Sequence, residues 1–217
     1  MSIKKLDLAE PFFKVKYLLN EQEYAIGEKT ILINLSDKPI KVQNQEIGFF
    51  RSVVVTNTKI YQIDRGLLIE DFASYANEEA LLQDVKKVWP LAYDVRKEER
   101  LKGVSHYMSP KANLGNIVLS MYHSGSVPLK VGLHQTHPHG GGTLKEVHTQ
   151  IMGFGKMQQC LEKDINTLYL EEAMAPGTTH HPMFDEQGNY PWHQYETITP
   201  GIFMAIEMQM SDELGVE

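Results

Sequence analysis

The residues of this chain most suited to chemistry are its histidines. All nine lie between His106 and His193, and the first 105 residues contain none. Imidazole is the commonest metal ligand of proteins and the commonest general acid or base near neutral pH. This distribution predicts one reactive site, built in the second half of the chain.

Two histidines are spaced so that they can share one face of a strand. His137 and His139 flank Pro138, and alternate residues of an extended strand point to the same side. Pro138 cannot donate to a β-ladder, which favours a strand end or an edge strand. Glu146 and His148 alternate in the same way. If that second face points inward, a carboxylate joins the imidazoles.

A further histidine follows a predicted turn. Pro176 and Gly177 stand shortly before His180; proline presets φ and glycine accepts a positive φ, so the pair predicts a tight turn. His180 can then begin the next strand. Two or three imidazoles with one carboxylate, and with open positions left, are typical of a mononuclear divalent metal site.

These two motifs resemble those of the cupin superfamily. The positions that match its first motif are Gly132, His137, His139, Glu146 and Gly153. The positions that match its second motif are Pro176, Gly177 and His180. The resemblance covers roughly residues 115–210 and implies an all-β fold, a double-stranded β-helix or jelly-roll barrel. It also implies the metal ligands His137, His139, Glu146 and His180.

The first motif departs from the family pattern in its spacing. Six residues separate His139 from Glu146, more than the family motif has. The extra glycines can bulge outward and leave Glu146 in place as the ligand. Alternatively they shift the strand so that His148 becomes the ligand instead.

Three further residues are candidates for roles in catalysis. His148 or His193 can act as a proton shuttle, because an imidazole titrates near neutrality. Tyr195 can donate a hydrogen bond to a substrate. His193 and Tyr195 belong to an aromatic segment, 190–195, that would suit a lid over a pocket; an ordinary turn with packed aromatic side chains is the alternative.

The elements that must position these residues are mainly strands. Short β-rich runs bounded by turn residues occur at 30–35, 49–56, 59–63, 116–122, 146–157, 167–170 and 202–208. One helix is expected near 78–89, capped by Asn77 and stopped by Pro90. Residues 94–103 are rich in charge, which favours a solvated connector. We expect an N-terminal β-rich layer at 1–105 packed on a cupin barrel at 106–217, in one compact domain.

Composition limits the partners and the cellular setting. The chain of 217 residues has a formal net charge of −7 and lacks a strongly basic cluster of lysines and arginines in its sequence. Nucleic acid is therefore not an expected partner. No apolar run reaches the length of a membrane span, and residues 1–13 lack the apolar core of a signal peptide. The single cysteine, Cys160, fits a reducing compartment. A cytoplasmic protein is expected.

The resemblance implies a metal-dependent enzyme acting on a small oxygen-rich molecule. Our first hypothesis is an Fe(II)-dependent dioxygenase. The second is a redox-neutral isomerase, epimerase or lyase that uses Mn, Zn or Ni. The third is a non-catalytic small-molecule-binding cupin with a structural metal. The resemblance also implies a homodimer.

Overall fold

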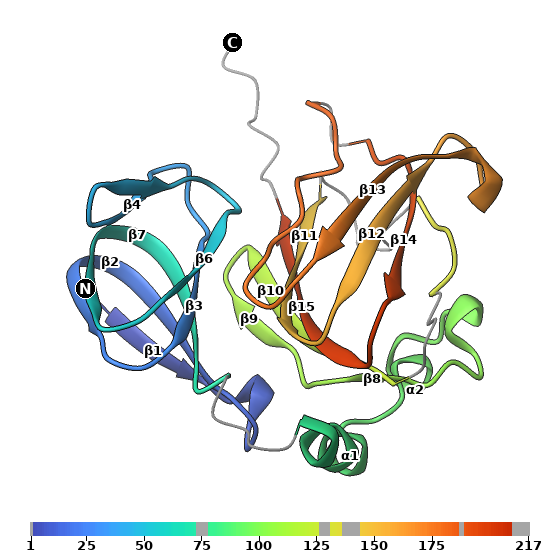
Figure 1. The fold of residues 1–217 in the computed structure, drawn as a ribbon, viewed down its shortest axis with the longest axis horizontal. Helices are drawn as coiled ribbons and strands as arrows, with labels where there is room; N and C mark the ends of the chain where they lie inside the picture. The colour runs from blue at the N-terminus through green and yellow to red at the C-terminus, as the bar shows by residue number, and fades with distance from the viewer. Residues whose placement is uncertain (1, 73–77, 126–130, 136–143, 187–188, 210–217) are drawn as a thin grey trace.

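The computed structural model describes residues 2–72, 78–125, 131–135, 144–186 and 189–209. Its first 70 residues form a seven-stranded antiparallel sheet with the order β1-β2-β7-β3-β6, in which β4 pairs with β5 and β7 (Figure 1). The strands are β1 (Ser2–Leu6), β2 (Lys14–Ile26), β3 (Thr30–Asn34), β4 (Ile40–Val42), β5 (Gln45–Ile47), β6 (Ser52–Val55) and β7 (Thr58–Glu70).

The second half of the chain contributes two more antiparallel sheets. A five-stranded sheet has the order β11-β15-β10-β8, with β9 paired to β10, and a three-stranded sheet has the order β13-β12-β14. The five-stranded sheet contains β8 (His106–Met108), β9 (Ala112–Leu114), β10 (Ile117–Ser124), β11 (Leu144–Met152) and β15 (Gly201–Gln209). The three-stranded sheet contains β12 (Gly155–Cys160), β13 (Leu168–Met174) and β14 (Trp192–Thr197).

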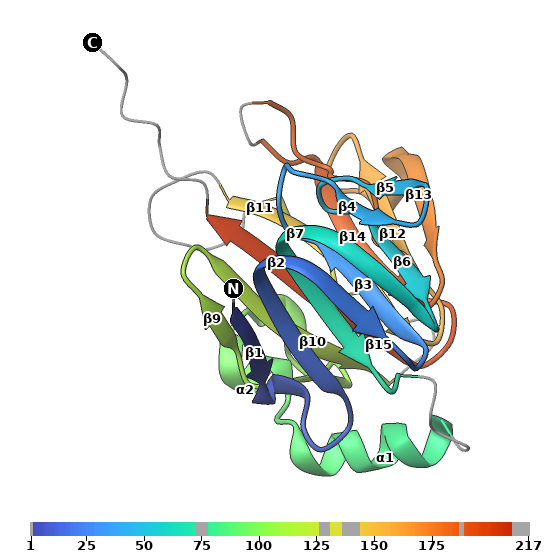
Figure 2. The ribbon, with the colours of Figure 1, turned by 90° about the vertical axis from the view of Figure 1, so that its left-hand side faces the viewer.

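The five-stranded sheet is the middle layer of the molecule. Along β15, Phe203 and Ala205 join a core cluster with Met157 and Tyr195 of the three-stranded sheet. The alternate residues of β15 point the other way, into a cluster that also contains side chains of β3 and β7. These residues are Ile202, Met204, Ile206 and Met208. Because both faces are covered, β15 is buried along almost its whole length. Figure 2, viewed from the side of the N-terminal sheet, shows that sheet lying over β10 and β15.

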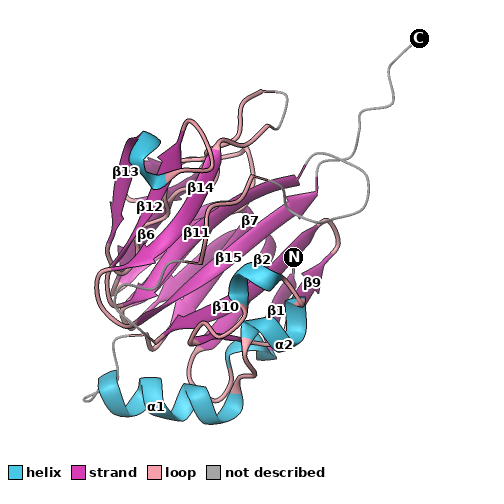
Figure 3. Cartoon of the chain, turned by 90° about the vertical axis from the view of Figure 1, so that its right-hand side faces the viewer, coloured by secondary structure: helices cyan, strands magenta, loops and turns pink. Residues whose placement is uncertain are grey.

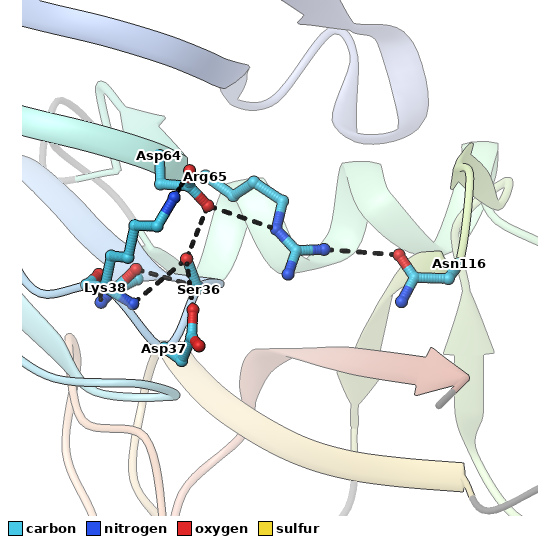
Figure 4. Close-up of polar contacts among 7 residues, drawn as sticks. Ser36, Asp37, Lys38, Asp64, Arg65 and Asn116 are labelled. Atoms are coloured by element: carbon cyan, nitrogen blue, oxygen red, sulfur yellow. Dashed lines mark hydrogen bonds and ion pairs between the residues drawn. The ribbon is translucent and has the colours of Figure 1, made fainter. Parts of the chain in front are cut away.

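Polar contacts also join the N-terminal sheet to the barrel, which is formed by the five-stranded and three-stranded sheets. Arg65 of β7 donates from Nη1 to Oδ1 of Asn116, at 3.4 Å, and Asn116 lies just before β10 (Figure 4). On the other side of Arg65, the carboxylate of Asp64 accepts hydrogen bonds from Ser36 at 2.7 Å and Lys38 at 2.9 Å. These two hydrogen bonds lower the pKa of Asp64, so the carboxylate stays charged beside Arg65.

Two short helices close one end of the sheets (Figure 3). The predicted helix is confirmed as α1 (Glu78–Val88), which buries Leu81, Leu82 and Val85 against the core; Asn77, expected to cap it, lies outside the described residues. Helix α2 (Ala92–Arg96) and the single 3₁₀ turn Glu99–Leu101 follow. None of the helices in the described part of the chain has the length and apolar character needed to cross a membrane.

The structure refines two expectations about local structure. Residues 94–103 are a solvated connector only in part: the side chains of Lys97 and Lys102 are 70% and 63% exposed, but those of Arg96 and Arg100 are 14% and 22% exposed. The run 146–157 is divided into β11 and β12 at Gly153, with φ +67°, where the glycines of the run predict the end of the first strand. A Cβ at Gly153 would lie 2.3 Å from the carbonyl oxygen of Pro200, so only glycine fits this turn. The all-β fold class is confirmed.

Candidate functional site

A small cavity lies between the five-stranded and three-stranded sheets. Its volume is about 40 Å³, and it is lined from one side by residues of β10, β11 and β15 and from the other by residues of β12 and β14. A water molecule needs roughly 10–15 Å³ of such space. The cavity therefore suits an ion with a few waters or a short ligand.

Strand β11 presents two of the predicted site residues to this cavity. Glu146 and His148 are two positions apart and therefore share the inward face of the strand. Glu146 is 3% exposed and His148 is 9% exposed. Oε1 of Glu146 lies 3.3 Å from Nε2 of His148. The alternation read from the sequence thus places a carboxylate and an imidazole side by side.

The predicted turn brings His180 against His148. Residues 177–180 run along β11, with the Gly177 N–H donating to the Gln150 carbonyl at 2.8 Å and the His180 N–H to the His148 carbonyl at 3.2 Å. Gly177 has φ +87°, as the second central residue of a type II turn requires. Nε2 of His180 lies 2.9 Å from the backbone nitrogen of His148 and 3.1 Å from its Nδ1.

The hydrogen bonds of His180 define its tautomer. Nδ1 lies 2.6 Å from the carbonyl oxygen of His181, and a carbonyl can only accept, so Nδ1 carries the proton. Nε2 is then the acceptor for the two donors of His148. Burial, followed by the neighbouring His148, lowers the pKa of His180 to about 3. The ring is therefore neutral at physiological pH, the form in which histidine binds metals.

His148 links His180 to Glu146. Since Nε2 of His180 accepts, Nδ1 of His148 donates to it, at 3.1 Å. On the other side of the ring, Nε2 of His148 lies 3.3 Å from Oε1 of Glu146. The three side chains therefore form one connected series of polar groups.

The donor set fits a divalent metal in chemistry. Imidazole and carboxylate are ligands that first-row divalent ions accept. Two of the four expected ligands, Glu146 and His180, lie among the described residues, and each contacts His148. Among the described residues, no group of three or more His, Cys, Asp or Glu side chains is arranged to hold a metal. His137 and His139, the other two expected ligands, lie outside them.

A second histidine pair borders the cavity. His134 and His193 are joined by two backbone hydrogen bonds, of 3.0 and 2.9 Å, and their ring centroids are 4.3 Å apart. Nδ1 of His134 donates to the Gly132 carbonyl and Nδ1 of His193 to the Pro191 carbonyl. In the neutral rings, Nε2 is therefore the acceptor nitrogen, as in His180.

The sequence predicts the segment 190–195 to be either a lid or an ordinary turn, but residues 192–195 are part of a strand in the barrel wall. His193 and Tyr195 belong to β14, which pairs with β12. Tyr195 is 2% exposed and donates to Oε1 of Gln150 at 3.0 Å. Its ring lies where a side chain at Gly155 would be, because a Cβ there would meet the Tyr195 ring and hydroxyl within 2.5 Å. Burial raises the pKa of Tyr195, so its hydroxyl keeps its proton.

Two arginines that were not predicted as site residues, Arg96 and Arg100, line the cavity. Nε of Arg96 lies 2.5 Å from Oε1 of Glu98, and its Nη1 donates to the Tyr122 hydroxyl at 2.7 Å. Nη2 of Arg100 lies 2.6 Å from Oε2 of the same Glu98, and its Nη1 donates to the Val131 carbonyl at 2.9 Å. Nothing in their charge-rich local sequence separates them from solvated residues.

His106 gives the cavity a neutral aromatic wall. Its ring stacks on Tyr122, with centroids 4.9 Å apart and planes 8° from parallel. Burial, followed by the nearby Arg100 and Arg96, lowers the pKa of His106 to about 3. The arginines therefore face an uncharged ring on this side of the cavity.

No family model and no curated protein sequence matches this chain. Several solved structures are similar to it at low identity. A cupin 2 conserved barrel domain protein from Leptotrichia buccalis is 14% identical, with 96% of this chain and 88% of that chain covered and a TM-score of 0.30. A mutant of Bacillus subtilis oxalate decarboxylase is 11% identical, with 94% and 69% covered and a TM-score of 0.34. AerE from Microcystis aeruginosa is 9% identical, with 96% and 97% covered and a TM-score of 0.34.

The assignment of the fold rests on this chain's own features. The five-stranded and three-stranded sheets enclose a common core. The two motif segments that the structure describes, around Glu146 and His180, meet inside it. The chain is an antiparallel β-barrel protein with an additional N-terminal sheet.

Proposed function

We propose that this protein is a metal-dependent cupin enzyme acting on a small oxygen-rich molecule, with an Fe(II)-dependent dioxygenase as the first subtype. The observation that carries the proposal is the contact of Glu146 and His180 with His148, of which Glu146 and His148 line the cavity. These residues come from two segments about 30 positions apart, and each is a metal donor or a proton carrier.

Four residues are proposed to hold the metal: His137, His139, Glu146 and His180. A divalent metal bound there supplies Lewis acidity and, if it is iron, a site for dioxygen beside a chelating substrate. Coordination through Nε2 of His180 would replace its hydrogen bond with the His148 amide. His148 stays beside Glu146, where it can orient that carboxylate and accept or release a proton.

The second candidate is a redox-neutral isomerase, epimerase or lyase that uses Mn, Zn or Ni. The contact between Glu146 and His148 favours it, because such reactions need a group that accepts and returns a proton beside the substrate. His193 is a further candidate shuttle, since its ring borders the same cavity. A non-catalytic cupin with a structural metal is the third candidate, and it needs His148 as an additional ligand to close the site.

The first test is the metal content of the protein, purified without chelator and without a histidine tag. Elemental mass spectrometry should find about one equivalent of a first-row divalent metal. The double variant His137→Ala/His139→Ala should lose it, whereas the control His181→Ala, at an exposed histidine, should keep it. Absence of metal from the wild-type protein, before and after reconstitution, would refute the proposal.

Oxygen uptake separates the subtypes. With diketones, catechols and hydroxyacids as trial substrates, an iron-loaded dioxygenase should consume oxygen in step with the substrate. Substrate conversion without oxygen uptake would instead support the redox-neutral enzyme. Metal binding without turnover of any of them would favour the structural-metal alternative.

We also propose a homodimer as the assembly. Light scattering coupled to size-exclusion chromatography should give about twice the mass of one 24.7 kDa chain. A single monomeric peak across the protein concentrations tested would refute it.

A further inference from the structure

We propose that Arg96 and Arg100 form a binding site for the carboxylate group of a short organic acid, which is the substrate if the proposed function is correct. The chain contains four arginines, and two of them, four positions apart, line this small cavity. The others lie elsewhere: Arg51 is exposed, and Arg65 bridges the N-terminal sheet to Asn116 (Figure 4).

The two arginines are too buried to be ordinary surface charges. Their side chains are 14% and 22% exposed. Removing a guanidinium from water costs free energy, which a partner of opposite charge must offset. The carboxylate bound directly to both is Glu98, itself 19% exposed. One glutamate therefore serves two guanidinium groups.

The balance of charge around the cavity favours an anion. Arg96 and Arg100 carry two positive charges, and Glu98 and Glu146 carry two negative charges. A divalent metal at the proposed site would leave the lining with two positive charges in excess. The chain as a whole has a net charge of −7, so this positive potential is local to the cavity.

Both guanidinium groups keep donors for a ligand. Within the part of the chain that the structure describes, Arg96 uses Nε and Nη1, and Arg100 uses Nη1 and Nη2. This leaves one nitrogen of each guanidinium, Nη2 of Arg96 and Nε of Arg100, without a hydrogen bond or ion pair to a described residue. Each can donate one charge-assisted hydrogen bond to a carboxylate oxygen.

The size of the cavity favours a short acid. The part lined by described residues has a volume of about 40 Å³, which suits a short molecule better than a long chain or a sugar ring. A molecule with one carboxylate on the arginines and a second oxygen-bearing group towards Glu146 and His148 meets both requirements. Malonate is a suitable probe, and malonamide is its uncharged counterpart of nearly the same shape.

The test is calorimetric binding of malonate, malonamide and inorganic phosphate to the full-length protein, as purified and after metal removal. We expect malonate to bind more tightly to the metal-loaded form, which has the excess positive charge, than to the metal-free form. Malonamide and phosphate should bind at least about tenfold more weakly than malonate. The variants Arg96→Gln and Arg100→Gln should each weaken malonate binding by about tenfold or more, the size expected for one charge-assisted bond. The matched control Arg51→Gln should bind as the wild type does.

Arg100→Lys provides a second variant if the glutamine variants unfold. It keeps the charge and loses the planar edge, so malonate binding should weaken less than in Arg100→Gln. Wild-type protein that binds malonate no better than malonamide, or that prefers phosphate, would overturn the inference. So would folded arginine variants with unchanged affinity for malonate.

The results that would refute the proposed function differ from those that would refute the carboxylate site. Arginine-dependent malonate binding by a protein that holds no metal would refute the metal-dependent enzyme and leave the carboxylate site intact. A metal-loaded, active enzyme whose folded arginine variants bind malonate normally would refute only the carboxylate site.

Discussion

Nε2 of His180 accepts a hydrogen bond from the backbone N–H of His148, with the two nitrogens 2.9 Å apart. The contact joins the second motif segment to the strand that carries the first. It depends on the backbone of His148 and not on its imidazole, so substitution of the His148 side chain leaves the donor in place. The two histidines can therefore be tested separately.

We expect unequal effects on metal binding when these histidines are replaced. His180→Ala removes a proposed ligand and should reduce metal occupancy to background. His148→Ala removes a group that orients Glu146, for which a loss in affinity of about 10- to 100-fold is typical. Metal titration of the purified variants by elemental analysis measures both, with His181→Ala as the control. If His148→Ala abolishes binding and His180→Ala does not, His148 is the ligand.

Gly177→Ala should destabilise the protein by about 1–3 kcal/mol. Gly177 has φ +87°, and a Cβ there would lie 2.3 Å from Cγ2 of Val54 in β6. The control is Gly103→Ala, at φ +73° with no atom within 4 Å of the added Cβ. Urea unfolding followed by circular dichroism compares them. Equal losses would show that backbone conformation alone, and not the contact with β6, restricts Gly177.

Buried histidines should make the protein less stable in mild acid. Burial is the main cause that lowers the pKa of His123 to about 4 and that of His106 to about 3. Below the ordinary pKa of about 6.5, the unfolded chain binds protons that the folded chain does not. Stability is thus fully present above pH 6.5 and falls as the pH drops towards 4. The slope approaches about 1.4 kcal/mol per pH unit for each histidine.

His123→Leu tests this origin of the acid sensitivity. The free energy of unfolding, measured in urea between pH 4.5 and 8, should depend less steeply on pH in this variant than in the wild type. His181→Leu, at an exposed position, should keep the wild-type slope. A His123→Leu variant with an unchanged slope would show that other groups cause the loss of stability in acid.

Tyr195→Phe should lower the free energy of unfolding by about 1–3 kcal/mol. The substitution leaves Oε1 of the buried Gln150 without its donor, which lies 3.0 Å away. Tyr169→Phe is the matched control, because Tyr169 donates to Oε1 of Gln159 at 2.9 Å but is 52% exposed. Water can replace the bond there, so the loss should be smaller. Similar losses for the two variants would contradict this reasoning.

The sequence by itself determined the elements whose pattern is local. Alternation placed Glu146 and His148 on one face, and the Pro176–Gly177 pair predicted the turn that brings His180 to β11. Apolar spacing and flanking residues predicted α1 almost to its ends. Strand alternation, turn residues and helical apolar spacing each involve only a few neighbouring residues. The backbone preferences that produce them act over the same short stretch of chain, so they can be predicted from the sequence.

Only the tertiary structure decided the remaining parts of the site. The local sequence predicts that Arg96 and Arg100 are solvated. Their burial depends on Glu98, on the hydroxyl of Tyr122 and on the carbonyl of Val131, and the last two are remote in sequence. The segment that carries His193 became a barrel wall through pairing with β12, more than 30 residues earlier. Long-range strand pairing and charge burial are properties of the assembled core, so no local pattern encodes them.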